Sequence, residues 1–280
     1  MMRLTWLGAL YALLSATAFS ELIEKPVTFE NGLGSAVLYY DDNYDDKYDD
    51  KDDDKDDGGK QHKQPQAGVV VVHEWWGLNE YSRGRARQLA ELGYPAIAVD
   101  MYGHGKVAKH ASDAKSFMNA AFAEPEQMNA RFEQARKALA TVAKVPRDRQ
   151  YAVGYCFGGA VVLGQARSGA DLAGVASFHG SLGTKTPAQP GTINARVLVA
   201  TGGADPMVPP EQVGQFVQEM SSAGAKLELL SFPEAKHSFT NPDADAAGAA
   251  NALPLAYDPQ ADAESWAALL RFIGQADAAQ

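Results

Sequence analysis

The sequence is short of cysteine, of excess positive charge and of long hydrophobic runs, and each shortage excludes a class of protein. One cysteine among 280 residues, Cys156, excludes an internal disulfide framework. The 25 basic residues are outnumbered by 35 acidic ones, and without a basic stripe we expect no nucleic-acid partner. Beyond the N-terminus no apolar run is long enough to span a bilayer. The histidines lack His-x-x-His or His-x-x-x-His spacing, so no metal site is expected.

The first twenty residues differ from the rest of the chain. Arg3 gives a positive start, an apolar run follows at residues 4–14, and small residues suited to cleavage lie at 16–18 and 18–20. This pattern predicts a signal peptide over residues 1–20 and export of the protein, to a periplasm if the source is bacterial. The alternative is a retained membrane anchor, for which the run is short.

A second unusual segment is strongly acidic. Residues 41–57 hold eleven aspartates and three lysines, a net charge of −8, so the rest of the chain carries only about −2 of the total of −10. We expect residues 41–66 to be a disordered, solvated loop, because the segment has no apolar period. Its origin, as natural repeat expansion or as an added tag-like sequence, stays open. Calcium loops need a set ligand spacing and a turn glycine, and the Asp/Lys alternation of this segment supplies neither.

The remainder alternates apolar runs with segments of helical spacing. This alternation predicts one α/β domain over residues 21–280, with a mostly parallel central sheet covered by helices on both faces. A hairpin is expected around Asn31 and Gly32. Strands are expected within 27–29, 35–40, 67–77, 94–103, 149–155, 172–180, 195–203 and 226–232. Helices are expected within 80–93, 111–144 with a break at Pro125, 157–167, 210–224 and 263–275.

The single cysteine lies where a catalytic residue of such a sheet would lie. Residues 154–158 read Gly-Tyr-Cys-Phe-Gly, at the end of an expected strand and the start of an expected helix. This is the nucleophile-elbow pattern G-x-S-x-G with cysteine in place of serine. The positive end of the helix dipole would favour the thiolate of Cys156. The alternative is a tight turn with a cysteine that only fills space.

Two further residues complete a catalytic pattern. Asp205 follows the expected strand at 195–203, and His237 follows the expected strand at 226–232. Alone, Asp205 could be a turn residue and His237 a surface histidine. Together with Cys156 they fall in the order nucleophile, acid, histidine, which is the order of α/β-hydrolase triads.

The roles follow from the residue types. Cys156 is expected to attack an acyl carbon, His237 to transfer the proton, and Asp205 to orient the imidazole. The oxyanion requires two backbone N–H donors, which we assign to Phe157, directly after the nucleophile, and to Trp75.

Four segments together resemble the dienelactone hydrolase family: HEWWGLN (73–79), GYCFGG (154–159), GGADPMVP (202–209) and HSF (237–239). The resemblance extends from about residue 67 to 275. It implies an α/β-hydrolase fold, cleavage of lactones or esters, and no metal or organic cofactor. It also implies that Glu74 lies beside the catalytic cysteine and tunes its protonation.

One position departs from the family. Members that act on dienelactone hold the substrate carboxylate with arginines, one of them shortly after the histidine, where this chain has Asn241. A neutral amide cannot form a charged bidentate clamp, so dienelactone itself is not the expected substrate. Of the other polar residues, His73 is expected to point away from the pocket, while His104 and His179 are expected to be structural or to support the site.

The sequence therefore predicts a hydrolase of small esters or lactones. A monomer is expected, but the sequence does not determine the oligomeric state. Two alternatives remain open. One is a general carboxylesterase on the same scaffold. The other is an envelope binding protein without catalysis that uses the acidic loop, since a fold does not guarantee an activity.

Overall fold

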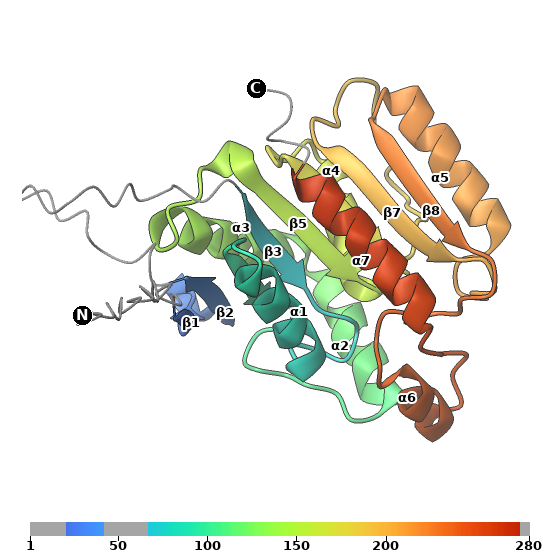
Figure 1. Cartoon of the computed structure of the whole chain (residues 1–280), viewed down its shortest axis with the longest axis horizontal. Helices are drawn as coiled ribbons and strands as arrows, with labels where there is room; N and C mark the ends of the chain where they lie inside the picture. The colour runs from blue at the N-terminus through green and yellow to red at the C-terminus, as the bar shows by residue number, and fades with distance from the viewer. Residues whose placement is uncertain (1–20, 42–66, 275–280) are drawn as a thin grey trace, which may run out of the picture.

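Eight strands form one twisted sheet in the order β1-β2-β4-β3-β5-β6-β7-β8 (Figure 1). The computed structural model describes residues 21–41 and 67–274, so the predicted signal peptide and nearly all of the acidic segment lie outside the described residues. The strands are β1 (Leu22–Thr28), β2 (Ser35–Asp41), β3 (Gly68–Val72), β4 (Ala96–Val99), β5 (Gln150–Tyr155), β6 (Gly174–Phe178), β7 (Arg196–Gly202) and β8 (Leu227–Phe232). The helices are α1 (Glu80–Glu91), α2 (Ala111–Ala123), α3 (Pro125–Thr141), α4 (Phe157–Arg167), α5 (Pro210–Ala223), α6 (Ala244–Asn251) and α7 (Pro259–Gly274).

The predicted mixed α/β fold is confirmed. β4, β3, β5, β6, β7 and β8 run parallel, whereas β1 and β2 form an antiparallel hairpin that joins the sheet through β4. The hairpin turn is a short 3-10 helix at Glu30–Gly32, in which Asn31 adopts a left-handed φ of 56°. Asparagine and glycine tolerate this conformation better than other residues, which is why this pair marks the turn.

The parallel strands are apolar throughout because helices cover both faces of the sheet. Alternate residues of β3 face opposite sides of the sheet. Val70 and Val72 pack in the core beneath α3, α4 and α5. Val69 and Val71 pack in the opposite core, beneath α1 and α7. Figure 1 shows α1 and α7 lying together across the near face of the sheet.

Helix α6 was not expected from the sequence. Its segment, ADAAGAAN, contains almost only alanine and small polar residues and so has no apolar period to indicate a buried face. Ala244 nevertheless packs in a small cluster with Trp76 and Leu255, where the lack of bulk allows close approach. Helix α7 also begins earlier than expected, at Pro259, a residue that suits the first turn of a helix.

Helices of the described ranges are all too short or too polar to cross a membrane. The carboxyl ends of the parallel strands meet at one edge of the sheet. Glu74 follows β3, Cys156 follows β5, Asp205 follows β7 and His237 follows β8, so the topology brings these four side chains to the same edge.

Candidate active site

Cys156 occupies a strained turn between β5 and α4. Its φ of 53° and ψ of −112° are sparsely populated for any residue with a side chain. The glycines around it are required for close packing: a methyl group on Gly154 would overlap the carbonyl oxygen of Gly158, and one on Gly158 would overlap that of Val72. The turn therefore projects the Cys156 side chain away from the sheet, as in a nucleophile elbow.

The structure brings the predicted cysteine, histidine and aspartate together in one chain of hydrogen bonds. His237 Nε2 lies 3.1 Å from Cys156 Sγ, and His237 Nδ1 lies 2.8 Å from Asp205 Oδ2. The other carboxylate oxygen of Asp205 accepts the backbone N–H of Met207 at 2.8 Å, which fixes its orientation. Asp205 and His237 are buried, whereas Cys156 is partly exposed, so the sulfur is the accessible end of the chain.

The electrostatics of His237 favour its charged form. Burial alone would lower the pKa of this histidine, but the adjacent Cys156 sulfur and the Asp205 carboxylate outweigh burial and raise the pKa to about 10. An imidazolium beside the sulfur stabilises a thiolate, which is the nucleophilic form of cysteine. The raised pKa therefore keeps a positive charge on His237, whose Nε2 lies 3.1 Å from the Cys156 sulfur, at neutral pH.

The two residues predicted to supply oxyanion donors, Phe157 and Trp75, both line the cavity beside Cys156. Phe157 is the first residue of α4, where backbone N–H groups have no partner within the helix. Trp75 lies in the loop after β3 and lines the same cavity as Cys156 and Phe157. Within the described residues, neither of these N–H groups donates to another protein group. The carbonyl of Trp75 accepts a hydrogen bond from the Tyr102 hydroxyl at 2.9 Å, which orients the peptide.

Glu74 is completely buried, and its carboxylate binds residues of the loop that carries His237. Ser238 donates its hydroxyl to one oxygen at 2.7 Å, and Asn241 donates its amide to the other at 2.6 Å. Burial raises the pKa of Glu74, and these two hydrogen bonds partly offset the effect. The described contacts include no hydrogen bond from Glu74 to Cys156, so the carboxylate reaches the triad through the His237 loop rather than through the sulfur.

Asn241 does not line the cavity in which Cys156 lies. The position at which the family resemblance places a substrate clamp is thus used here to hold Glu74. His73 is buried and neutral, because burial lowers its pKa to about 4, and it does not line the cavity. His104 is exposed and lies outside the cavity lining.

His179 packs against the ring of His237 and contacts the loop that carries it. Its ring lies 5.4 Å from that of His237, and its Nε2 is 2.7 Å from the hydroxyl of Thr240. Tyr81 contacts the same hydroxyl at 2.6 Å. Burial, and then the charge of His237, hold the pKa of His179 well below its ordinary value, so a neutral ring packs against the imidazolium.

The sequence reasoning missed Ser238, Thr240 and Tyr81, which hold the His237 loop. For Ser238 and Thr240 the available signal was the three polar residues among the four that follow the histidine, Ser238, Thr240 and Asn241, in the loop after β8. The spacing of residues 238–241 did not reveal which of their side chains form buried contacts in the folded protein.

The triad opens into a cavity of about 740 Å³. Cys156, His237 and Trp75 lie at one end of its lining, and most of its wall is apolar. A cavity of this size fits a small organic ligand. The arrangement therefore places a thiol, a histidine paired with a carboxylate, and the backbone of Trp75 and Phe157 around one apolar cavity.

Comparison with known proteins agrees with this geometry. The model of the dienelactone hydrolase family matches residues 58–277. A protein of Escherichia coli (strain K12), named "Putative carboxymethylenebutenolidase", is 30% identical over 190 residues, which cover 64% of this chain and 70% of that protein. The crystal structure of a dienelactone hydrolase-like promiscuous phosphotriesterase from metagenomic libraries has a TM-score of 0.76 at 31% identity and covers 91% of this chain and 98% of its own.

A more distant structure identifies the fold alone. An α/β hydrolase enzyme from a Medee basin deep-sea metagenome library is 14% identical, with a TM-score of 0.63, and covers 92% of this chain and 99% of its own. The fold is thus the α/β-hydrolase fold. The chain belongs to the dienelactone hydrolase family and is a dienelactone hydrolase-like hydrolase.

Proposed function

We propose that this hydrolase cleaves a lactone or carboxylic ester through a thioester formed on Cys156. The observation that carries the proposal is the hydrogen-bond chain from Cys156 Sγ through His237 to Asp205, with distances of 3.1 and 2.8 Å. A thiolate with a charged histidine beside it, at the mouth of an apolar cavity, is arranged for attack on an acyl carbon.

In the first half of the reaction the Cys156 sulfur forms a bond to the carbonyl carbon. The carbonyl electron pair moves onto oxygen, where the N–H groups of Phe157 and Trp75 stabilise the negative charge. The carbonyl re-forms, the bond to the alcohol oxygen breaks, and His237 gives its Nε2 proton to that oxygen. In a lactone the alcohol stays attached to the acyl group as a free hydroxyl.

The second half is hydrolysis of the thioester. His237 Nε2 takes a proton from water as the water oxygen attacks the thioester carbon, and the Cys156 sulfur leaves as thiolate. Asp205 accepts the hydrogen bond of the His237 Nδ1–H throughout and stabilises the ring when it is charged.

Glu74 acts in this proposal as a positioning residue. It directly precedes Trp75, and its carboxylate is bonded to Ser238, the neighbour of His237. One buried side chain thereby links the loop that supplies an oxyanion donor to the loop that supplies the histidine. Because Glu74 touches neither the sulfur nor the cavity, its effect is expected on the placement of both loops.

The test is hydrolysis of p-nitrophenyl acetate by the wild-type protein and by the Cys156→Ala and His237→Ala variants. We expect kcat/KM to fall at least about a thousandfold in each variant. Mass spectrometry of the quenched wild-type reaction should show an acetyl group on Cys156. Retention of activity by Cys156→Ala, or acetylation at another residue, would contradict the proposal. Comparison of kcat/KM for a panel of lactones and esters then identifies the preferred class of substrate.

We also propose that the protein is exported, on the basis of the signal-peptide pattern in residues 1–20, which lie outside the described residues. The mass of the protein purified from its native host tests this. Cleavage after residue 18 or 20 is expected, and a chain in the cell interior that keeps those residues would contradict export.

A further inference from the structure

The cavity beside Cys156 extends far beyond the triad along one face of α4. The residues of this helix region that line it are Phe157, Ala160, Val161, Gly164, Gln165, Arg167 and Ser168. Apart from Arg167, successive members of this set are one or three residues apart, as one face of a helix requires. From Phe157 to Ser168 this face is about 16 Å long. The cavity is therefore a groove that begins at the nucleophile and follows the helix.

The walls of this α4 groove are largely apolar. Met118 and Phe122 come from α2, Met128 comes from α3, and Val208 precedes α5. Phe122 remains 44% exposed, although its ring contacts that of Phe157 at 5.2 Å. An exposed aromatic beside a nucleophile leaves apolar surface that a ligand can cover.

Of the described residues that line the groove, Arg167 alone carries a fixed charge, and that charge is already neutralised. Its guanidinium donates to both oxygens of Glu219, each at 2.9 Å, and to the carbonyl of Leu182 at 2.7 Å. The side chains of Arg167 and Glu219 are 8% and 11% exposed, so a substrate anion would have to displace a buried ion pair. Apart from His237, which is paired with Asp205 and lies beside Cys156, the described lining residues leave no cation to hold a carboxylate.

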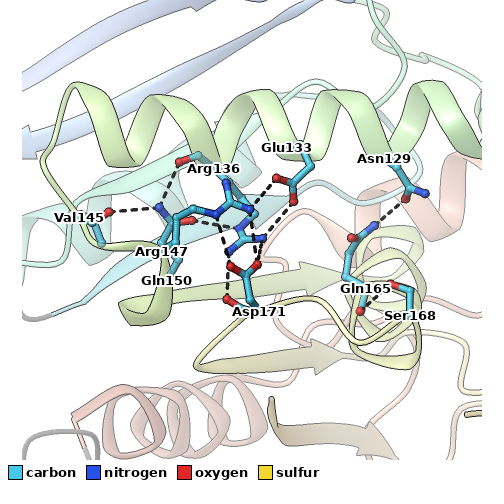
Figure 2. A network of polar contacts seen from close by, with 9 residues as sticks. All are labelled: Asn129, Glu133, Arg136, Val145, Arg147, Gln150, Gln165, Ser168 and Asp171. Atoms are coloured by element: carbon cyan, nitrogen blue, oxygen red, sulfur yellow. Dashed lines mark hydrogen bonds and ion pairs between the residues drawn. The ribbon is translucent and has the colours of Figure 1, made fainter. Parts of the chain in front are cut away.

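The uncharged polar side chains that line the groove are the amides of Gln165 and Asn129 and the hydroxyls of Ser168, Ser181, Thr184 and Thr186. Gln165 on α4 donates its amide to the side chain of Asn129 on α3 at 2.8 Å. Figure 2 shows this pair spanning the two helices, well separated from the charged cluster around Arg136 and Asp171. Neutral amides orient a ligand weakly compared with a charged clamp.

Gly164 marks open space halfway along the groove. A methyl group on Gly164 would meet no atom within 4 Å, and the residue is exposed although it lies on the lined face of α4. The helix position lies about 12 Å along the axis from Cys156. A larger side chain here can fill the groove without clashing with the protein.

We propose that the α4 groove binds an extended, uncharged apolar chain of the substrate, so that the enzyme prefers medium-chain esters or alkyl-substituted lactones to small or carboxylate-bearing ones. This inference rests on the proposed function, because it assumes that the reacting ester lies at Cys156. The chain lies against Phe157, Val161 and Met128 and ends near Gln165. Its burial lowers the free energy of the bound complex with each methylene removed from water.

The first experiment compares kcat/KM for p-nitrophenyl acetate, p-nitrophenyl octanoate and the mono-p-nitrophenyl ester of suberic acid, whose chain has the length of octanoate but ends in a carboxylate. We expect octanoate to exceed acetate and the suberate ester by at least about tenfold each. The Gly164→Leu variant should lose about tenfold on octanoate and change acetate by less than about twofold. Gly214→Leu is the matched control, because Gly214 is an exposed helical glycine of α5 with no atom within 4 Å of an added methyl, and it should leave both esters unchanged.

A binding measurement separates this inference from the proposed function. Calorimetry of 2-decanone and 2-butanone with the Cys156→Ala variant, and with Cys156→Ala combined with Gly164→Leu, involves no turnover. We expect 2-decanone to bind at least about tenfold more tightly than 2-butanone, and the added leucine to remove the difference.

The outcomes are distinct. Tight binding of 2-decanone without hydrolysis of any ester would support the groove and refute the hydrolytic role of Cys156. Hydrolysis of all esters without a chain-length preference, or an equal loss on acetate and octanoate in Gly164→Leu, would overturn the groove inference and leave the hydrolase proposal standing. A suberate ester that reacts as well as octanoate would overturn the preference for an uncharged chain.

Discussion

Asn241 donates its side-chain amide to the carboxylate of Glu74 over 2.6 Å, and both side chains are buried. The contact joins the loop after β3 to the loop after β8, which lie 167 residues apart in the chain. Asn241 is thereby committed to the protein and not to the substrate. Asn241 is also absent from the lining of the cavity beside Cys156.

Removal of this amide should destabilise the protein through Glu74. Asn241→Ala is expected to lower the free energy of unfolding by about 2 kcal/mol, because it leaves a buried carboxylate with one donor fewer. In a Glu74→Gln background the same change should cost about 1 kcal/mol less, since the partner is then uncharged. Urea unfolding of the four proteins measures the coupling. Asn194→Ala, which removes only a 3.3 Å exposed hydrogen bond, is the control and should have little effect. Additive losses would disprove the coupling.

The charge of His237 predicts an unusual pH dependence of thiol reactivity. With its pKa raised to about 10, this histidine stays protonated across neutral pH and keeps a positive charge beside the sulfur. We expect the rate of alkylation by iodoacetamide to fall less than about fivefold from pH 9 to pH 6, and by roughly a hundredfold in His237→Ala, where the thiolate has no partner. Cys156 is the only thiol, so the signal needs no assignment. Parallel pH profiles for the two proteins would contradict the ion pair.

The strained backbone of Cys156 should lower the stability of the protein, and a glycine at this position should relieve that strain. A glycine adopts a φ of 53° and ψ of −112° without side-chain strain, whereas alanine does not. Strain relief of about 1–3 kcal/mol exceeds the entropic cost of glycine, about 0.4–1 kcal/mol. Cys156→Gly is therefore expected to be more stable than Cys156→Ala by about 1 kcal/mol, as measured by urea unfolding. Greater stability of the alanine variant would show that the turn is not strained.

His73 should make the protein sensitive to acid. Its Nε2 accepts the backbone N–H of Met101 at 3.2 Å, and its Nδ1–H donates to the carbonyl of Glu74, so the neutral ring is held by both nitrogens. Burial lowers the pKa of His73 from 6.5 to about 4. The unfolded chain therefore binds the proton first as the pH falls, and stability is lost between about pH 6.5 and pH 4.

The loss assigned to His73 is roughly 2–3 kcal/mol over that range. His73→Gln keeps one donor and one acceptor but has no proton to gain, so its free energy of unfolding should fall correspondingly less between pH 7 and pH 4.5. The exposed His104→Gln is the control and should follow the wild type. An unchanged acid sensitivity in His73→Gln would assign the effect to other groups.

The pattern of the sequence alone predicted much of this fold, because its signals are local. Continuous apolar runs at β3 and β5 indicate strands buried on both faces, and Asn31 with Gly32 indicates the turn between the first two strands. Helix α6 escaped prediction because alanine and glycine carry no period. Its position depends on contacts with Trp76 and Leu255 that are distant in sequence.

The candidate site was likewise predictable from the sequence only in part. Cys156, Asp205 and His237 could be chosen from the sequence because each follows a strand, and parallel strands present their carboxyl ends at one edge of the sheet. Their residue types then limit the chemistry to nucleophile, acid and proton carrier. Distances play no part in that choice, and the triad's 3.1 and 2.8 Å contacts follow from the folded loops.

Which partners the other polar side chains near the site contact was determined only by the tertiary structure. Whether Asn241 faces a ligand or a buried carboxylate, and whether Arg167 is free or paired with Glu219, depends on partners brought together by the sheet. In a helix or strand, side-chain direction repeats at a fixed residue interval and can be predicted from the sequence. A loop has no such interval, so the direction of its side chains cannot be predicted in this way. The sequence thus determined the fold class and the order of the reactive residues, whereas three-dimensional packing determined which charges remain available to a substrate.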